Sequence, residues 1–169
     1  QCDPEENVDD WDEERIWAEL QRRVDGPDGF QLKRGPIFEK VVLKFRSYVG
    51  EPMRYGNMFL AGDAAHTVPP TGAKGLNLAF ADVQVLFDAL KAHFIDGNSE
   101  GLDGYSDKAL KRVWKAQNFS YWMTQMLHTR KDATPFETKR ALGELNTVVS
   151  SKYGQSYLAE SYTGWPHED

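Results

Sequence analysis

Apolar residues recur at the 3.6-residue spacing of a helix over five stretches of the chain. The clearest stretch starts at Leu76, and Phe80 and Val83 follow on the same face. Thr134 can cap the fourth stretch, with Glu137 placed to complete a capping box. The pattern predicts helices over residues 11–24, 76–94, 102–128, 134–149 and 153–161.

Only two segments have the pattern of a strand. Residues 37–49 alternate between apolar and charged side chains, with Val41 and Leu43 on one side and Lys40 on the other, which predicts a half-buried strand. Residues 58–61 form a short, continuous apolar run that is typical of a buried strand. Because the few strands precede the helices and no βαβ alternation is present, the predicted fold class is α+β.

Composition narrows the class of protein. The 169 residues are 40% hydrophobic and 27% charged, which excludes a disordered chain, a collagen-like repeat and a disulfide scaffold. No run of about 18 apolar residues is present, so we expect no contact with a membrane. The net charge of −6 argues against nucleic acid as a partner. Cys2 is the single cysteine, which excludes an internal disulfide and predicts a reducing, cytoplasmic location. Because the chain opens on Gln1 and not on Met, we expect it to be part of a longer protein.

The segment between the second predicted strand and the helix at 76 has the residue types of a ligand site. Gly62 and Asp63 follow the apolar run directly, and a carboxylate at the end of a strand suits a ligand with hydroxyl groups, because it accepts their hydrogen bonds. Gly75 lets the backbone approach a flat ligand closely. The first N–H groups of the helix, at Leu76 and Asn77, can hold an electron-rich oxygen or nitrogen.

The same segment is expected to be rigid. Pro69-Pro70 restricts the backbone, and Gly72 offers a second point of close approach to a flat ligand. A strand, a turn and a helix without a ligand would explain the Gly-Asp pair alone, but not the run 59–77 as a whole. Within this run, His66 is interpreted as structural. Lys74 could be a surface lysine or a charge near the ligand, and the surface interpretation is favoured.

The run 62–77 resembles the second FAD-binding motif of the flavin-dependent aromatic hydroxylases. Other segments are similar to the C-terminal half of the family members that act on 4-hydroxybenzoate, and the resemblance covers nearly the whole chain. These segments are residues 9–15, 49–53, 112–116, 119–124 and 159–164. The resemblance implies part of an FAD- and NAD(P)-dependent α/β monooxygenase, which uses NADPH and O2 to hydroxylate 4-hydroxybenzoate ortho to the phenol and gives 3,4-dihydroxybenzoate.

The resemblance also implies cofactor contacts for individual residues. Asp63, which follows Gly62, would accept hydrogen bonds from the ribityl chain of FAD. The backbone N–H groups of Leu76 and Asn77, which follow Gly75, would face the N1/C2-carbonyl edge of the flavin. No metal site is expected, because the four histidines lack the spacing of metal ligands.

Three residues are implied to act on the substrate. Pro70 and Thr71 would lie beside the substrate and the flavin ring. Tyr162 would belong to the proton relay that removes the phenolic proton of the substrate. The resulting phenolate has a more electron-rich ring, which favours hydroxylation.

The resemblance further implies pieces of three domains. Residues 1–55 would be the tail of a substrate-binding domain, residues 56–97 a returning segment of the FAD-binding domain, and residues 98–169 a helical interface domain that supports a homodimer. The G-x-G-x-x-G turn that holds the pyrophosphate of FAD is missing from the sequence, and the family's clamp for the substrate carboxylate would precede Gln1. We therefore expect the isolated chain to be inactive and to bind FAD weakly.

Two other interpretations stay open. A related flavin hydroxylase with another phenolic substrate would share Asp63 and the Pro-Pro-Thr-Gly loop but differ in the clamp. A non-catalytic module would use residues 98–169 for self-association and leave the Gly-Asp loop without a purpose. Residues 97–101 also match the G-x-S-x-G pattern of hydrolases, but a helix is predicted where the hydrolase nucleophile needs a preceding strand.

Overall fold

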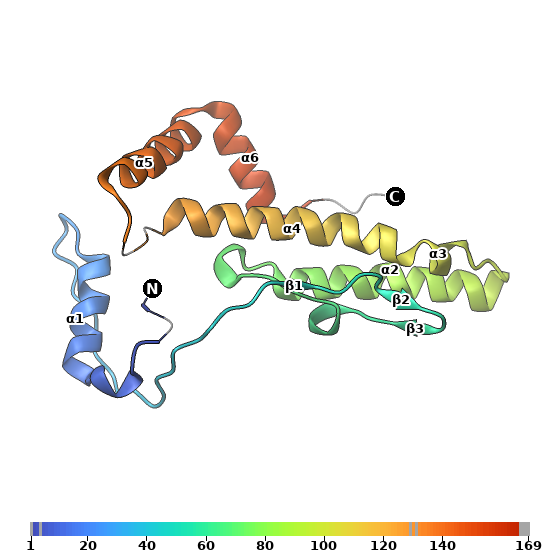
Figure 1. Cartoon of the computed structure of the whole chain (residues 1–169), viewed down its shortest axis with the longest axis horizontal. Helices are drawn as coiled ribbons and strands as arrows, with labels where there is room; N and C mark the ends of the chain where they lie inside the picture. Colours follow the sequence, from blue (N-terminus) through green and yellow to red (C-terminus); the bar gives the residue numbers. More distant parts are fainter. Residues whose placement is uncertain (1, 4, 129, 131, 166–169) are drawn as a thin grey trace. The chain divides into compact units, whose positions relative to one another are not determined.

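The computed structural model describes residues 2–3, 5–128, 130 and 132–165. The chain divides into two compact units, residues 1–44 and residues 45–169. Figure 1 shows the order of the helices and strands along the chain. Among the described residues, no helix is long and apolar enough to cross a membrane.

The first unit is built around helix α1 (Glu13–Val24), which follows a 3-10 turn at Val8–Asp10. The apolar pattern predicts this helix from residue 11, but it begins at Glu13, after its cap Asp12, whose side chain accepts a hydrogen bond from the Arg15 N–H at 2.8 Å. Apolar spacing alone leaves the first residue of a helix open, because the cap decides it.

The strand predicted over residues 37–49 is wrong except for its last two residues, which form β1 (Tyr48–Val49). Residues 37–47 adopt no regular structure, and the side chains of Phe38 and Phe45 are 92% and 64% exposed. Alternation shows which side chains could share a face, but a strand also needs a neighbour to bond its N–H and C=O groups. In the described part of the chain, no strand pairs with residues 37–47.

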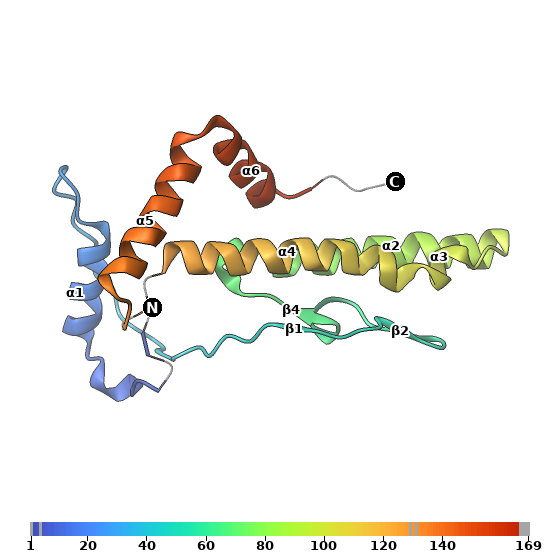
Figure 2. The same ribbon diagram turned by 45° about the horizontal axis from the view of Figure 1, so that its top comes forward.

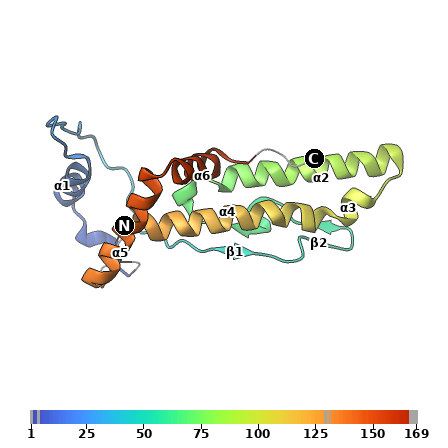
Figure 3. The same cartoon turned by 90° about the horizontal axis from the view of Figure 1, so that it is seen from above.

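Two long helices form the centre of the second unit. Helix α2 (Gly75–Asp96) ends at Gly97, which adopts the left-handed conformation (φ 69°) that terminates many helices. The single helix predicted over residues 102–128 is interrupted, and forms α3 (Glu100–Asp103) and α4 (Tyr105–Leu127). Helix α4 runs alongside α2 (Figure 3). The buried side chains at the centre of this unit include Leu78, Tyr105, Ala109, Val113 and Ala116.

A pair of short strands connects the loop after residue 60 to the start of the second unit. Strand β1 pairs antiparallel with β4 (His66–Thr67), with Val49 opposite His66. Gln117 on α4 is buried, and its Nε2 donates a hydrogen bond to the Thr67 carbonyl at 2.7 Å. The strand pair is therefore fixed to α4.

A hairpin precedes that loop. Strands β2 (Arg54–Tyr55) and β3 (Met58–Phe59) pair antiparallel around Gly56, which has a φ of 59°. The buried strand predicted over residues 58–61 is therefore only two residues long, and its Met58 is 57% exposed. With helices dominant and four two-residue strands in the described part of the chain, the architecture is consistent with the predicted α+β class.

Helix α5 (Pro135–Ser150) begins at the predicted capping box. The Thr134 hydroxyl accepts a hydrogen bond from the Glu137 N–H at 3.2 Å, and the Glu137 carboxylate accepts one from the Thr134 N–H at 2.7 Å. The capping box needs only residues three apart in the sequence, which explains why the sequence predicts it correctly.

Helix α6 (Lys152–Thr163) folds back against α5 (Figure 2). A Cβ atom at Gly154 would lie 2.6 Å from the Val148 carbonyl oxygen, so glycine permits this close approach. Helix α6 and the segment after it reach α4, where Leu158 and Trp165 pack against a buried cluster of Phe119, Met123 and Met126.

Candidate functional site

The Gly62–Asp63 turn is mounted directly on helix α2. Gly62 opens a 3-10 turn (Gly62–Ala64) with a φ of 59°, and a Cβ atom on it would lie 3.2 Å from the Ala79 Cβ. Asp63 is exposed at the apex of this turn. Glycine is therefore needed both for the backbone conformation and for the close contact with α2, and Asp63 is left accessible to a ligand.

Beneath the turn lies a buried polar cluster. The side chains of His66 and Asp82 are 1% and 2% exposed, and His66 Nε2 lies 2.6 Å from Asp82 Oδ2. The same Asp82 oxygen accepts a hydrogen bond from the Gly62 N–H at 2.9 Å. His66 is thus part of the core, as the sequence predicts, whereas nothing in the sequence pattern singles out Asp82 on the apolar helix.

Tyr105 secures the residue before the turn. Its hydroxyl donates a hydrogen bond to the Leu60 carbonyl at 2.8 Å. Burial, and then the negative charge of Asp82, raise the pKa of Tyr105 well above its ordinary value of 10.0. The hydroxyl therefore keeps its proton, and keeps donating it to Leu60, throughout the neutral range.

The proline-rich part of the loop is tied to helix α4. Thr71 lies in a 3-10 turn (Pro70–Gly72), and its Oγ1 is 2.7 Å from Thr124 Oγ1. Because the Thr124 hydroxyl donates to the Ser120 carbonyl at 2.7 Å, it is the Thr71 hydroxyl that donates to Thr124. Pro70 is exposed at the start of this turn.

Gly72 has a different role from the one that the sequence suggests. It is buried, and a Cβ atom on it would lie 2.9 Å from Ser120 Oγ and 3.2 Å from Phe119 Cδ1. The expected neighbour was a flat ligand, but the close neighbour is helix α4. Gly72 therefore allows the loop to pack on α4. At Gly75, Val68 is the one described neighbour within 4 Å of the Cβ position, at 4.0 Å, so this glycine stays compatible with a ligand.

Helix α2 begins with accessible N–H groups. The helix starts at Gly75 without a side-chain cap, and the Leu78 N–H, which donates to the Lys74 carbonyl at 2.9 Å, makes the first hydrogen bond of helical spacing. Leu76 is 70% exposed and Asn77 is also exposed. The N–H groups that precede the first helical bond, together with the positive end of the helix dipole, suit an electron-rich atom of a ligand.

Lys74 is buried and not on the surface, which corrects the expectation from sequence. It is 4% exposed, and its Nζ donates a hydrogen bond to the Tyr162 carbonyl at 2.5 Å. The ammonium group also lies 5.4 Å from the ring centre of Phe119 and 5.7 Å from that of Trp165. Burial lowers the pKa of Lys74. No local sequence signal marks this burial, because the residues that cover Lys74 lie far along the chain.

Through Lys74, the structure brings Tyr162 close to the loop. Tyr162 is on the last turn of α6, and its ring is edge-on to Phe119, with ring centres 6.4 Å apart. Its side chain is 54% exposed, and the Lys74 Nζ lies 5.8 Å from its ring centre. Residues almost 90 positions apart in the sequence are therefore neighbours, with the phenol accessible.

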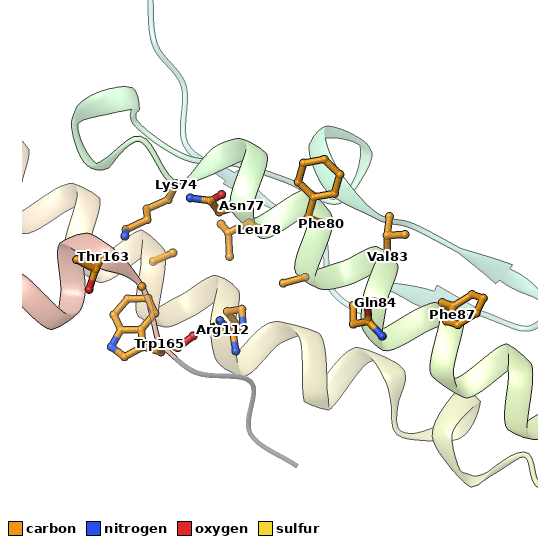
Figure 4. Close-up of a pocket in the computed structure, with 13 residues that line it drawn as sticks. Lys74, Asn77, Leu78, Phe80, Val83, Gln84, Phe87, Arg112, Thr163 and Trp165 are labelled. Carbon is orange, nitrogen blue, oxygen red and sulfur yellow. Dashed lines mark hydrogen bonds between the residues drawn. The ribbon is translucent and has the colours of Figure 1, made fainter.

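A cavity of about 760 Å³ opens beside this group, between α2, α4 and residues 163–165 (Figure 4). Lys74 and Trp165 lie at one end, and Phe80 and Phe87 follow α2 toward the other. The guanidinium of Arg112 donates to the Trp165 carbonyl at 2.9 Å. The cavity thus combines Lys74 at the start of α2 and Arg112 of α4 with an apolar wall.

The donor set of the site fits FAD in part. The exposed Asp63 carboxylate can accept hydrogen bonds from a polyhydroxyl chain, and the N–H groups at the start of α2 can face the edge of a flat ring. No cluster of three His, Cys, Asp or Glu side chains that could hold a metal ion is present among the described residues.

Comparison with known proteins gives a family match. A family model described as an FAD-binding domain matches residues 1–120. The chain is 47% identical over 163 residues to p-hydroxybenzoate hydroxylase of Acinetobacter baylyi, an alignment that covers 96% of this chain and 40% of that protein. It is also 33% identical over 114 residues to rifampicin monooxygenase of Streptomyces venezuelae, covering 67% of this chain and 23% of that protein.

A third relative matches over a shorter part of the chain. Kynurenine 3-monooxygenase of Aspergillus oryzae is 38% identical over 64 residues, which is 37% of this chain and 12% of that protein. The chain therefore spans less than half the length of each of these three relatives.

Proposed function

The chain belongs to the FAD-binding-domain family, whose cofactor is FAD, and on that premise we propose that it forms part of an FAD-dependent aromatic monooxygenase. The proposed reaction is hydroxylation of 4-hydroxybenzoate ortho to its phenol, with NADPH and O2 as co-substrates and 3,4-dihydroxybenzoate as product. The observation that carries the proposal is the 47% identity to a p-hydroxybenzoate hydroxylase over 96% of the chain, which extends into the helices beyond residue 120.

In this proposal, the start of α2 and the neighbouring turn hold the cofactor. The Asp63 carboxylate accepts hydrogen bonds from the ribityl hydroxyls, and Gly62 sets the turn that presents it. The N–H groups of Leu76 and Asn77, after Gly75, face the electron-rich edge of the ring. When bound, FAD would supply the redox chemistry by which electrons from NADPH activate O2 for transfer of one oxygen atom to the substrate.

The same proposal assigns the substrate to the space beside the 70–71 turn and Tyr162. Pro70 and Thr71 bound the substrate ring, and the Thr71 hydroxyl, which already donates to Thr124, stays fixed. Tyr162 belongs to the relay that removes the phenolic proton of the substrate, in which its hydroxyl accepts one proton as it gives up its own. The relay favours the reaction because a phenolate ring is more nucleophilic than a phenol. The exposure of the Tyr162 side chain supports this role, since the relay needs an open path for the proton.

We also propose that residues 98–169 support a homodimer and that the protein acts in the cytoplasm. Helices α5 and α6 expose large apolar side chains, including Phe136 and Tyr153, which are 75% and 85% exposed. Apolar side chains left on the surface in this number favour a protein partner.

A chimeric enzyme tests the proposed reaction. The part of the Acinetobacter baylyi p-hydroxybenzoate hydroxylase that aligns with this chain is replaced by this chain, and the product is assayed with 4-hydroxybenzoate and NADPH. We expect the chimera to retain FAD and to form 3,4-dihydroxybenzoate. The parent enzyme, purified in parallel, is the control for folding and for the assay.

The results of the chimera assay distinguish the proposed function from its alternatives. A folded chimera that retains FAD but hydroxylates only other phenols would favour a related hydroxylase with a different substrate. A folded chimera that retains no FAD would contradict the proposal. In a companion measurement, titration of the isolated chain with FAD should show weak binding, because its sequence has no G-x-G-x-x-G turn for the pyrophosphate.

A further inference from the structure

A single carboxylate oxygen closes the turn that presents Asp63. Asp82 Oδ2 accepts a hydrogen bond from the Gly62 N–H at 2.9 Å and lies 2.6 Å from His66 Nε2. Gly62 begins the turn and His66 begins β4 just after it, so Asp63 lies exposed between the two. The Asp82 side chain therefore holds the chain on both sides of Asp63 at one point on helix α2.

Burial makes this connection strong. Asp82 and His66 are 2% and 1% exposed, and Gly62 is also buried. Solvent water does not reach a buried group to replace a lost hydrogen-bond partner. Loss of one of these bonds therefore leaves a buried polar group unpaired, at a cost of about 1–3 kcal/mol. The close contact between Gly62 and Ala79 of α2 further restricts the turn to one position.

Helix α2 also carries the N–H groups that face the proposed flavin edge. Asp82 lies two helical turns after Gly75, a rise of about 10 Å along a rigid helix. The carboxylate of Asp63 and the first N–H groups of α2 are therefore attached to the same rigid body. Loss of the acceptor oxygen at position 82 would therefore alter their separation.

We propose that Asp82 is a positioning residue for the cofactor. Through Gly62 and His66, it holds the Asp63 carboxylate at a fixed separation from the N–H groups of Leu76 and Asn77, so that one bound FAD can meet both. This inference rests on the proposed function for the identity of the ligand. The hydrogen bonds that close the turn do not depend on that identity.

Two substitutions at position 82 separate positioning from simple packing. Asp82→Asn keeps an oxygen that can accept both hydrogen bonds, whereas Asp82→Leu fills a similar volume without an acceptor. Asp88→Leu, on the exposed side of the same helix, is the matched control. Leu102→Ala, in the buried part of α3, is a control that lowers stability away from the turn.

The first measurement is hydrogen exchange of the Gly62 amide in the 169-residue chain without flavin. We expect exchange to become about tenfold faster in Asp82→Leu, with Asp82→Asn and Asp88→Leu close to the original chain. The inference is overturned if Asp82→Leu leaves the Gly62 amide protected, or if Asp82→Asn exposes it equally. If Asp82→Leu fails to fold, as judged by circular dichroism, His66→Phe takes its place as the test. It removes the hydrogen bond between His66 and Asp82 and should speed the exchange of the amides of residues 63–65.

The second measurement is FAD affinity in the chimeric enzyme. We expect the dissociation constant to rise about tenfold in Asp82→Leu and to be restored by Asp82→Asn, while Leu102→Ala lowers the melting temperature without a comparable change in affinity. If affinity instead follows melting temperature in all variants, Asp82 is only a packing residue. If the chimera binds no FAD but Gly62 exchange behaves as expected, the proposed function fails and the positioning of the turn stands.

Discussion

The Lys74 ammonium donates a 2.5 Å hydrogen bond to the Tyr162 carbonyl, and so joins the start of α2 to the end of α6. Lys74 is almost fully buried, although a lysine is among the residues least often found inside a protein. The rings of Phe119, Tyr162 and Trp165 surround its ammonium group and partly compensate for the lost water. The position of Tyr162 in the candidate site thus depends on a residue of the loop.

Replacing Lys74 by methionine should release the segment that ends α6. Methionine keeps the packing of the lysine stem but leaves the Tyr162 carbonyl without its donor. We expect amides of residues 162–165 to exchange hydrogen about tenfold faster or more, with α5 unchanged. Lys111→Met, on an exposed position of α4, is the matched control, and equal exchange in both variants would contradict the docking role.

Replacing Gly72 by alanine should destabilise the second unit. The added Cβ would lie 2.9 Å from Ser120 Oγ and 3.2 Å from Phe119 Cδ1, so the loop or α4 must shift. We expect the free energy of unfolding, measured with urea, to fall by about 1–3 kcal/mol. Gly143→Ala is the control, because no residue that the structure describes outside its own turn of α5 lies within 4 Å of its Cβ position, and alanine favours a helix by about 0.8–1.0 kcal/mol. A Gly72→Ala chain as stable as the original would show that the loop does not need this close contact.

The raised pKa of Tyr105 should make the folded chain less stable at alkaline pH. Its pKa is raised in the folded chain by burial and by Asp82, so above its ordinary value of 10.0 the unfolded chain loses the phenolic proton first. Above pH 10.0 the folded state therefore binds more protons than the unfolded state, so the free energy of unfolding falls as the pH rises. Below pH 10.0 the contribution of Tyr105 to stability is retained, and above it the fall is at most about 1.4 kcal/mol per pH unit from this group.

The substitution Tyr105→Phe isolates that contribution. It should cost about 0.5–1.5 kcal/mol near neutral pH, through loss of the hydrogen bond to Leu60, and should flatten the decline above pH 10.0. Urea unfolding over a series of pH values measures both effects. Tyr55→Phe, at a position 79% exposed, is the control that should leave the pH profile unchanged, and an equally steep decline in Tyr105→Phe would contradict the assignment.

The features that the sequence predicts well are local. The apolar spacing that begins at Leu76 predicts α2 to within two residues at its C-terminal end, and Thr134 with Glu137 predicts the start of α5. Both depend only on residues one or two helical turns apart, which the sequence shows directly.

The features that the sequence misses depend on distant residues. The alternation over 37–47 predicts a strand that has no neighbour in the described part of the chain to pair with it. Lys74 is buried by aromatic rings that follow far later in the sequence, and Gly72 is required by side chains of α4. In the candidate site, the turn around Asp63 is recognisable as a motif, but the buried oxygen of Asp82 that closes it appears only once α2 is packed beneath the turn.

Tyr162→Phe in the chimeric enzyme tests the proposed proton relay. The phenylalanine ring keeps the edge-on contact with Phe119 but lacks the hydroxyl that takes part in the proposed relay. We expect hydroxylation to slow by a factor on the order of 100, with NADPH consumed and O2 reduced to hydrogen peroxide without matching product, while FAD retention is unchanged. Tyr153→Phe, at an exposed position of the same helix, is the control and should leave the ratio of product to NADPH unaltered. If the Tyr162→Phe chimera keeps the original hydroxylation rate and ratio of product to NADPH, Tyr162 has no part in the reaction. Its role would then be structural, through the hydrogen bond between its carbonyl and Lys74.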